Sequence, residues 1–545
     1  MITSTDYIMF HRELFYIIGI TSDGSKSTIT MDRSFRHMHY AGREAYGDDV
    51  LETRAEVCLM SRNIVYRGDD TSYATKFGAH IMIHAPGDEL VIGRIENLQL
   101  NAVGQAFLIG KYPIHYHMIG RVTKSYIRNN AIDGSFNRGI TLHGVKYLRV
   151  ERNCIHNAMG HTIFVEDAAE TKNYVAYNVV ALTMQSFSML NTDTTPANFW
   201  ITHPDNIFEG NRAAGSKAYG FWMDYQKTAI GASYNPNINP MGAKLGKFSN
   251  NVVHSVRKYG VRIYGGHIPP IPAVYENHIS YHCGKNGVMG GDYGHVILRN
   301  ITVADNKGSG IEFERINLGA DMIDRCRAEN LTVIGVSNGN PGSSRHGIVA
   351  PQSDLWFVTN ARFYNFNGGS AALGDCSHCN TPKADSGTRT TRFSELKFVN
   401  VSNRIRWNWP FKGIFHDLDG TLTEQGADSY VSAYWKHNDW PECIVDIPVY
   451  DGIICMAPLA IERIVFTKAS GNIDKKTMNV WQYDEANIAG MDEAALEQYL
   501  LPPNGSQVGW LQHARPTKHW TAPYVTNHRY YLRWSWGMDF ERVMI

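Results

Sequence analysis

The sequence is poor in cysteine, in net charge and in long apolar runs, and each shortage excludes a class of protein. Only 8 of the 545 residues are Cys, too few for a disulfide-rich scaffold. Cys376 and Cys379 form a CxxC pair, but no second pair follows at zinc-ribbon spacing, which favours a loop or a local disulfide. Lys plus Arg and Asp plus Glu both number 52, so the net charge is zero and no nucleic-acid partner is expected. No run of about twenty apolar residues occurs, so no transmembrane segment is expected in this chain.

The N-terminal residues also lack the pattern of a secretion signal. Asp6, Arg12 and Glu13 interrupt the apolar stretch, so we expect no signal peptide in this chain. Asn-x-Ser/Thr sequons favour an extracellular setting, although chance alone produces a few in a chain of this length. They begin at Asn300, Asn330, Asn400 and Asn504.

A repeated phrase of Asn followed by a short apolar strand runs through the middle of the chain. Asn130 and Asn153 lie 23 residues apart, and so do Asn277 and Asn300. A period in the low twenties, with Asn and Gly at the corners and no helical pattern, is typical of a parallel β-helix. The coils of such a helix stack about 4.8 Å apart. An antiparallel sandwich would instead show hairpins at varied spacing.

The phrase is confined to one part of the chain and therefore suggests a domain organisation. We predict an all-β protein with a parallel β-helix over residues 76–425. Residues 1–75 carry β-type segments that would cap or start the coil. Residues 426–545 are rich in Trp and Tyr and are expected to form a β-rich C-terminal region.

Aligning the strands that follow the Asn corners produces one polar row. Ile140–His143 precedes Ile163–Glu166 by 23 residues and follows Ile114–His117 by 26, and Phe221–Asp224 has the same pattern. Alternate residues of a strand face opposite sides, so apolar positions filling the core would turn the polar ones outward. The outward row would then contain His117, His143, Glu166 and Asp224, flanked by His161 and Asp167, with Asn191 or Asp193 near it from an irregular coil.

Such a row could carry acid/base chemistry. Carboxylates on adjacent coils would lie about 5 Å apart and those two coils apart about 10 Å, near the retaining and inverting glycosidase geometries. Histidine could position substrate, hold a metal or shift a carboxylate pKa. A solvated polar face with stacked histidines is the alternative. The catalytic candidates are Glu166, Asp224, Asp193, His143 and His161; the substrate-binding candidates are His115, His117, Arg138, Asp167 and Trp222.

The aromatic residues near the row have two interpretations. Trp200, Trp222 and Tyr225 could stack on sugar rings, or they could pack beneath a loop.

A second motif points to different chemistry. Asp417 and Asp419 stand in the DxDGTxT phrase of haloacid-dehalogenase-type phosphatases, but no alternating β/α pattern surrounds it, so a turn stabilised by Asp side chains is the preferred interpretation.

Several long motifs resemble one known family. Gly110–Gly120 (GKYPIHYHMIG), Ser135–Gly144, Met159–Asp167 and Phe199–Asn206 are similar to signatures of the G8-domain and CEMIP-type β-helix proteins. That group includes cell-surface hyaluronidases and, more distantly, fibrocystin-like receptors. The resemblance implies a right-handed β-helix with a partial G8-like β cap. Because most of a G8 domain would precede this chain, we expect a fragment or a shortened relative.

The resemblance also implies a function. It suggests an extracellular or cell-surface protein whose partner is hyaluronan or a related anionic polysaccharide, most simply a hyaluronidase-like glycoside hydrolase. A non-catalytic glycan-binding or adhesion protein is the alternative, and a polysaccharide lyase is a further one. Calcium dependence is implied and no other cofactor. Arg62 and Asp70 match a family region linked with activity, and basic residues could attract a uronate: Arg138, Lys146, Arg149 and Lys172.

Overall fold

The computed structural model describes residues 1–316 except Met189, then 326–351, 356–375, 391–408, 414–433 and shorter stretches from there to residue 544. It forms two compact units that are described separately. The first contains residues 1–313, 317–348 and 363–365, and the second contains residues 314–316, 349–362 and 366–545.

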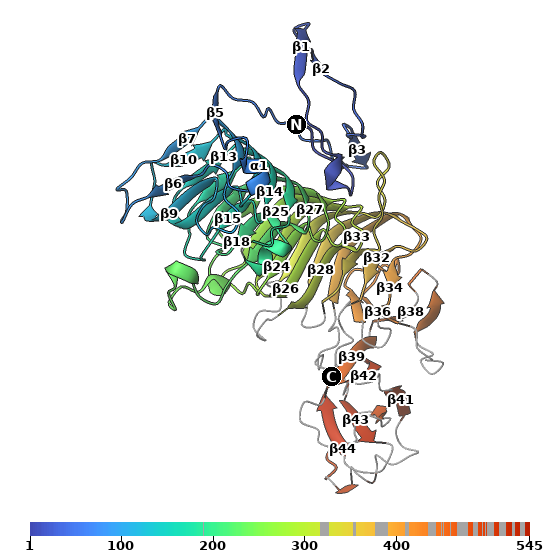
Figure 1. The fold of residues 1–545 in the computed structure, drawn as a ribbon. Helices are drawn as coiled ribbons and strands as arrows, with labels where there is room; N and C mark the ends of the chain where they lie inside the picture. Colours follow the sequence, from blue (N-terminus) through green and yellow to red (C-terminus); the bar gives the residue numbers. More distant parts are fainter. Residues whose placement is uncertain are drawn as a thin grey trace. The chain divides into compact units, whose positions relative to one another are not determined.

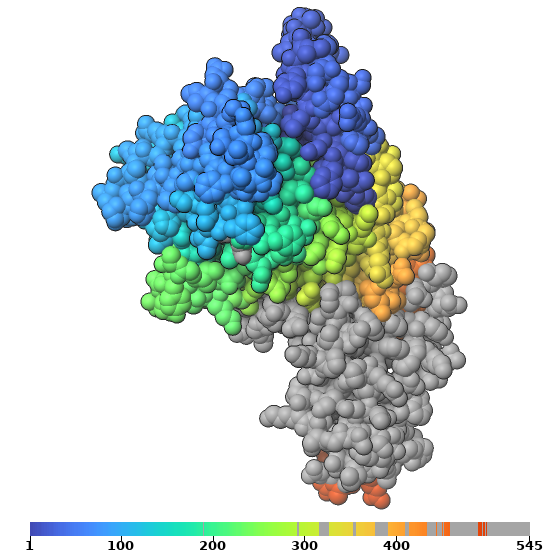
Figure 2. All heavy atoms as spheres, viewed as in Figure 1, coloured from blue at the N-terminus to red at the C-terminus, as the bar shows by residue number. Residues whose placement is uncertain are grey.

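The first unit is a parallel β-helix, as predicted, and Figure 1 shows its stacked strands. Three strands make one coil, for example β10 (Tyr126–Arg128), β11 (Ala131–Ser135) and β12 (Ile140–Lys146). Each pairs with a strand 23 residues later, as shown by Tyr126 opposite Arg149 and Ile140 opposite Ile163. The predicted period therefore holds for this coil. Figure 2 shows consecutive coils of this unit as neighbouring bands of colour.

One wall of the β-helix carries the polar row and is called the site sheet. Its strands within the first unit, in spatial order, are β6 (Ile81–His84), β9 (Ile114–Arg121), β12, β15 (Ile163–Val165), β18 (Ala197–Ile201), β21 (Tyr219–Asp224), β24 (Val261–Tyr264) and β26 (Val288–Tyr293).

The remaining walls belong to a second, longer sheet. Its short strands include β7 (Arg94–Glu96), β8 (Leu98–Val103), β13 (Arg149–Glu151), β14 (Cys154–Met159), β16 (Tyr174–Ala176), β17 (Val179–Met184), β19 (Ile207–Glu209), β20 (Arg212–Ser216), β22 (Lys247–Ser249) and β23 (Val252–Val256). Beyond these, single long strands replace the short pairs: β25 (Ala273–Tyr281), β27 (Val296–Ala304) and β29 (Arg327–Ile334).

A buried asparagine ladder fixes the corners between the short strands of the second sheet. The Nδ2 of Asn153 donates to the Oδ1 of Asn178 at 3.0 Å and to the carbonyl of Ile127 at 3.0 Å. Its own Oδ1 accepts from the backbone N–H of Asn130 at 3.1 Å. Because these groups are buried, each needs its partner, and a side-chain amide can serve two neighbouring coils at once. The ladder consists of Asn130, Asn153, Asn178, Asn211 and Asn251.

Parts of the first 60 residues contact the coils. The hairpin β1 (Ile17–Ser22) and β2 (Ser27–Met31) projects from the coils in Figure 1, and β3 (Arg43–Tyr46) pairs with β4 (Asp49–Glu52). The hydroxyl of Tyr7 donates to the carbonyl of Asp305 at 2.6 Å. A disulfide joins Cys58 to Cys154. Parallel pairing begins at β5 (Ile64–Arg67), which lies opposite β8.

The second unit is β-rich, as expected for the C-terminal region. β33 (Thr391–Val401) pairs in parallel with β35 (Ile414–Asp417), and antiparallel pairing follows in β36 (Ser429–Ala433) and β38 (Gly452–Met456). Antiparallel strands follow: β39 (Leu459–Val465), β40 (Met478–Gln482), β41 (Ser506–Leu511), β42 (His519–Val525), β43 (Arg529–Trp534) and β44 (Phe540–Met544). The domain boundaries at residues 75 and 425 stay predictions.

The phosphatase-like phrase forms a turn in this unit. Asp417 accepts from the N–H and the hydroxyl of Thr423, both at 2.8 Å, and Asp419 accepts from the hydroxyl of Thr421 at 2.7 Å. The two carboxylates therefore stabilise the turn, which agrees with the interpretation of this phrase as a turn. Cys376 and Cys379 lie outside the described residues.

Candidate functional site

Strand register brings the strands of the predicted polar row side by side. Ile140 and Leu142 face Ile163 and Val165 across β12 and β15, and His143 lies opposite His117 across β12 and β9. The apolar members are fully buried, so the alternate positions turn to the other side of the sheet. Phe199 on β18 lies between Ile163 and Phe221. Glu166, Thr202 and Asp224 each follow these three residues by three positions. The same register therefore places Thr202, and not Asn191 or Asp193, between Glu166 and Asp224.

Four histidines gather at one end of the row. His84 lies opposite His117, and its Nδ1 is 2.8 Å from the carbonyl of His117. The Nδ1 atoms of His117 and His143 are 3.1 Å apart. The Nδ1 of His115 is 2.9 Å from the carbonyl of Gly110, and its ring stacks parallel to that of His143 at 5.8 Å. Burial lowers the pKa of His115 to about 3, so this imidazole is neutral at physiological pH.

Carboxylates orient His143 from behind. Its Nε2 is 2.7 Å from Asp167, and Asp167 also accepts from the backbone N–H of Ser233 at 3.0 Å. Burial opposes the charged form of His143, but the hydrogen bond to Asp167 and the nearby carboxylates raise its pKa above the ordinary value. Glu170 lies beneath this pair and accepts from the backbone N–H of Gly144 at 2.7 Å. Burial raises the pKa of Glu170 to about 7.

Glu166 occupies the next position of the row. Burial raises the pKa of its carboxyl group, although the positive charges of His143 and Arg138 oppose the shift. One oxygen accepts from the Tyr112 hydroxyl at 3.4 Å, and the other lies 3.4 Å from the Nδ1 of His143 without a hydrogen bond. A half-buried carboxyl group with a free oxygen is suited to proton transfer.

Asp224 lies two strands beyond Glu166. Burial raises the pKa of its carboxyl group to about 6, with the Arg262 guanidinium opposing the shift. Gln226 donates to it at 2.7 Å. Two strand spacings separate the two carboxyl groups by roughly 10 Å, just above the range of about 6.5–9.5 Å in inverting glycosidases.

Three predicted site residues are buried beside the row and bond to one another or to the backbone. Arg138 donates to both oxygens of Asp193, at 3.0 and 3.1 Å, and both side chains are 1% exposed. Asp193 also accepts from the backbone N–H of His161 at 3.0 Å. His161 is itself fully buried and accepts from the N–H of Ala197. This burial disfavours substrate contact for all three side chains, and their catalytic and substrate-binding roles stay predictions.

The aromatic residues show the packing alternative. Trp222 is 5% exposed and packs in one cluster with Phe164 and Trp200, and Arg138 lies over the Phe164 ring at 3.5 Å. Tyr225 is also buried. Of the two interpretations, the cover by neighbouring side chains favours packing for Trp222, and its sugar-stacking role stays a prediction.

Arg62 and Asp70 are not brought to the row. Arg62 donates to the backbone carbonyls of Asn129 and Leu59, at a corner of the second sheet. Asp70 is 95% exposed and lies 3.7 Å from Arg67.

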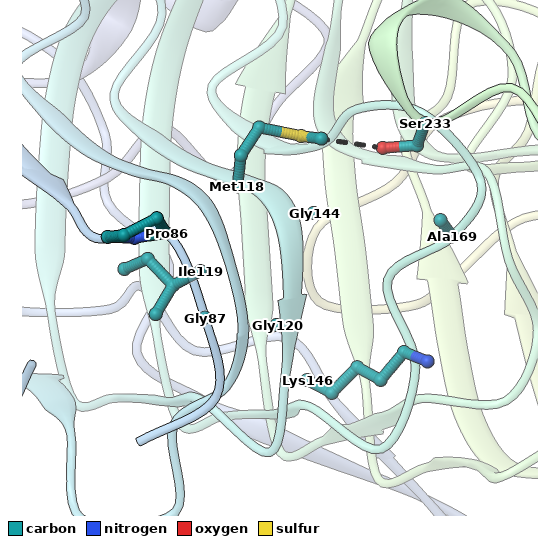
Figure 3. Close-up of a pocket in the computed structure, with 9 residues that line it drawn as sticks. All are labelled: Pro86, Gly87, Met118, Ile119, Gly120, Gly144, Lys146, Ala169 and Ser233. Carbon is teal, nitrogen blue, oxygen red and sulfur yellow. Dashed lines mark hydrogen bonds between the residues drawn. The ribbon is translucent and has the colours of Figure 1, made fainter. Parts of the chain in front are cut away.

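A cavity of about 330 Å³, drawn in Figure 3, is lined by Ser233, the residue whose backbone N–H donates to Asp167. Met118 and Gly144, the residues after His117 and His143, line it together with Ser233, whose hydroxyl lies 3.6 Å from the Met118 sulfur. Lys146 extends along the cavity and offers a positive charge to an anionic ligand.

The donor atoms decide which metal ions would fit. Calcium requires six to eight oxygen ligands, whereas the groups of close potential ligands among the described residues are rich in imidazole nitrogen. These groups are His115 with His117 and His143, and His143 with Glu166 and Asp167. They do not fit calcium, and the predicted calcium dependence remains a prediction.

Sequence reasoning missed three residues that shape the site. Ser233 approaches Asp167 from a loop 66 residues away, and nothing in the local sequence signals that contact. Glu170 and Tyr112 lie close to quoted motifs, but their contacts depend on how the coils are stacked. A polar residue three positions after the VED phrase was the available signal for Glu170.

Together, fold and site define a parallel β-helix protein with an outward row of histidines and carboxylates beside a cavity. Comparison with known proteins agrees: the CEMIP beta-helix family matches residues 76–261, and the right-handed beta-helix region matches residues 237–345. The chain is 30% identical to fibrocystin-L of Mus musculus over 514 residues, covering 83% of this chain and 12% of that protein.

Two further relatives extend this likeness. A G8 domain-containing protein of Dictyostelium discoideum is 29% identical over 525 residues, 83% of this chain and 44% of that protein. Human cell surface hyaluronidase CEMIP2 is 29% identical over 423 residues, 68% of this chain and 30% of that protein. Residues 76–261 of the chain are therefore a β-helix of the CEMIP type. The chain spans 12% of the length of the fibrocystin-L proteins. Among the described residues, no helix has the length and apolar character to cross a membrane.

Proposed function

We propose that this protein acts outside the cell, or at its surface, on hyaluronan or a related anionic polysaccharide, and that it cuts the chain within the polar row. The carrying observation is the placement of two half-buried carboxyl groups, Glu166 and Asp224, two strands apart on one face of the site sheet. Relatives named as cell surface hyaluronidases support the substrate class.

The geometry supports inverting hydrolysis. Asp224 would protonate the glycosidic oxygen, because its pKa of about 6 leaves a protonated fraction near neutral pH. Glu166 would act as base and activate a water molecule on the opposite face of the sugar ring, which the separation of roughly 10 Å leaves room for. Lys146 and Arg262 would attract the uronate groups of the polysaccharide.

A non-catalytic glycan-binding or adhesion role is the second candidate. One observation favours it: the Nε2 of His143 already donates to Asp167, so these two groups satisfy each other. A lyase reaction on the same scaffold is a weaker alternative. A calcium requirement is a further prediction for either reaction.

The test is size analysis of high-molecular-weight hyaluronan incubated with the full chain, with and without calcium. Asp224→Asn and Glu166→Gln remove the proposed acid and base, and Glu209→Gln, a carboxylate of the second sheet that pairs with Lys247, is the matched control. We expect shortening by the parent and the control but not by the two site variants. Absorbance from unsaturated ends would indicate a lyase. Binding without shortening would favour the adhesion role, and no binding would remove hyaluronan as the partner.

A further inference from the structure

In two imidazoles of the site, a hydrogen bond at one ring nitrogen determines that the other nitrogen carries the lone pair. A carbonyl oxygen only accepts, so the Nδ1 of His115 donates to Gly110 and leaves its Nε2 as a lone-pair donor. That Nε2 is buried and has no hydrogen-bond partner, and the residue is 1% exposed. His143 donates from Nε2 to Asp167, so its Nδ1, which is within hydrogen-bond distance of His117, is the nitrogen left to bind an ion.

The Nδ1 of His143 faces the Nδ1 of His117. The two Nδ1 atoms are 3.1 Å apart. Two nitrogen ligands bound to zinc at 2.0–2.1 Å in tetrahedral geometry lie about 3.3 Å from each other. The observed separation is therefore close to the one that a shared zinc ion requires. The ligand atoms of His115, His117 and His143 all lie within 4.8 Å of one another.

The surroundings match those of a metal centre with an open position. Asp167 receives the distal N–H of His143 and is itself held by the backbone N–H of Ser233 at 3.0 Å, an arrangement that orients imidazole ligands in metalloproteins. A free buried oxygen of Glu166 lies 3.4 Å from the ligating nitrogen of His143. The fourth position would face this carboxylate, as in catalytic zinc sites.

We propose that His115, His117 and His143 bind one divalent transition-metal ion of the zinc class. Imidazole nitrogens suit zinc, cobalt, nickel and copper and do not suit calcium or magnesium. The inference goes beyond the proposed function, because metal binding is measured without any glycan and holds whether or not hyaluronan is cut.

The test is a calorimetric titration of the metal-stripped, untagged full chain with Zn²⁺. Elemental analysis after gel filtration then measures how much zinc stays bound to each chain. Replacement by Co²⁺ reports ligand geometry through its visible absorption. His117→Gln and His143→Gln remove ligands, and Asp167→Asn removes the carboxylate behind His143. His416→Gln is the matched control, because His416 also contacts a carboxylate, Asp428 at 2.7 Å, but belongs to no group of three potential ligands among the described residues.

We expect one Zn²⁺ per chain and a tetrahedral Co²⁺ spectrum for the parent and for His416→Gln. The His117 and His143 variants should bind about 100-fold more weakly, and Asp167→Asn about 10- to 100-fold more weakly. Excess Ca²⁺ should not displace the ion. Absence of stoichiometric binding by the folded parent, equal binding by His117→Gln, or displacement by Ca²⁺ would overturn the proposal. If a ligand variant does not fold, the parent Co²⁺ spectrum and Asp167→Asn decide.

Discussion

Removing either member of the buried Arg138–Asp193 pair should destabilise the β-helix, and removing both should cost less than the two single changes added together. Both side chains are 1% exposed and share two hydrogen bonds. A buried charge that loses its partner costs about 3–5 kcal/mol, whereas replacing both charges by apolar residues of similar volume is often nearly neutral.

The two single variants should differ in a defined direction. Arg138→Met leaves a carboxylate that still accepts from the backbone N–H groups of His161 and Leu190, so we expect a loss of about 3 kcal/mol. Asp193→Leu leaves the guanidinium and both N–H groups without an acceptor, so we expect a loss of about 5 kcal/mol. The double variant should lose less than the Asp193 variant alone.

Equilibrium denaturation with guanidinium, monitored by tryptophan fluorescence, measures these differences, because Trp200 and Trp222 pack in the coil region beside the pair. A loss below about 1 kcal/mol for Asp193→Leu would contradict the buried pair. Strict additivity would contradict their contact. If the folded Asp193→Leu variant lost hyaluronan cleavage at normal stability, Asp193 would be catalytic, as the sequence analysis suggested.

Three further predictions test the site and the fold. Cleavage of hyaluronan should fall as the pH rises through about 6, because Asp224 must be protonated to act as the acid, and a pH–rate profile of the parent checks this limb. Asn153→Ala should lower the free energy of unfolding by about 3 kcal/mol, because it leaves buried groups of the ladder unpaired. The control is Asn277→Gly, at an exposed corner with φ of 52°, which should lower it by under about 1 kcal/mol in the same denaturation experiment. Replacing Cys58 and Cys154 by Ser should cost about 4 kcal/mol, because their disulfide closes a loop with a sequence separation of 96, and the shift in denaturation midpoint measures it.

The sequence was sufficient to predict the coil and the polar row because both depend on local rules. The 23-residue spacing follows from three short strands per coil, and strand alternation then assigns His117, His143, Glu166 and Asp224 to one face. These assignments need only the correct register of neighbouring strands.

The rest of the site depends on contacts that no local pattern encodes. Asp193 enters from a loop in the longer coil between β15 and β18, and its buried partner Arg138 lies 55 residues away. Trp222 has the alternation of an outward residue, yet side chains from neighbouring coils cover it. Alternation predicts the side of a sheet, and what packs above that side determines the exposure.

The spacing of the asparagine ladder has a consequence for how such proteins can diversify. Successive rungs are separated by 23, 25, 33 and 40 residues, although each pair is joined by the same hydrogen bond at 3.0–3.1 Å. The added residues therefore leave the coil between rungs and return without disturbing them. One such excursion carries Asp193, and another carries Ser233 to the cavity. The scaffold thus accepts insertions of varied length, so new binding loops can arise while the polar row keeps its register.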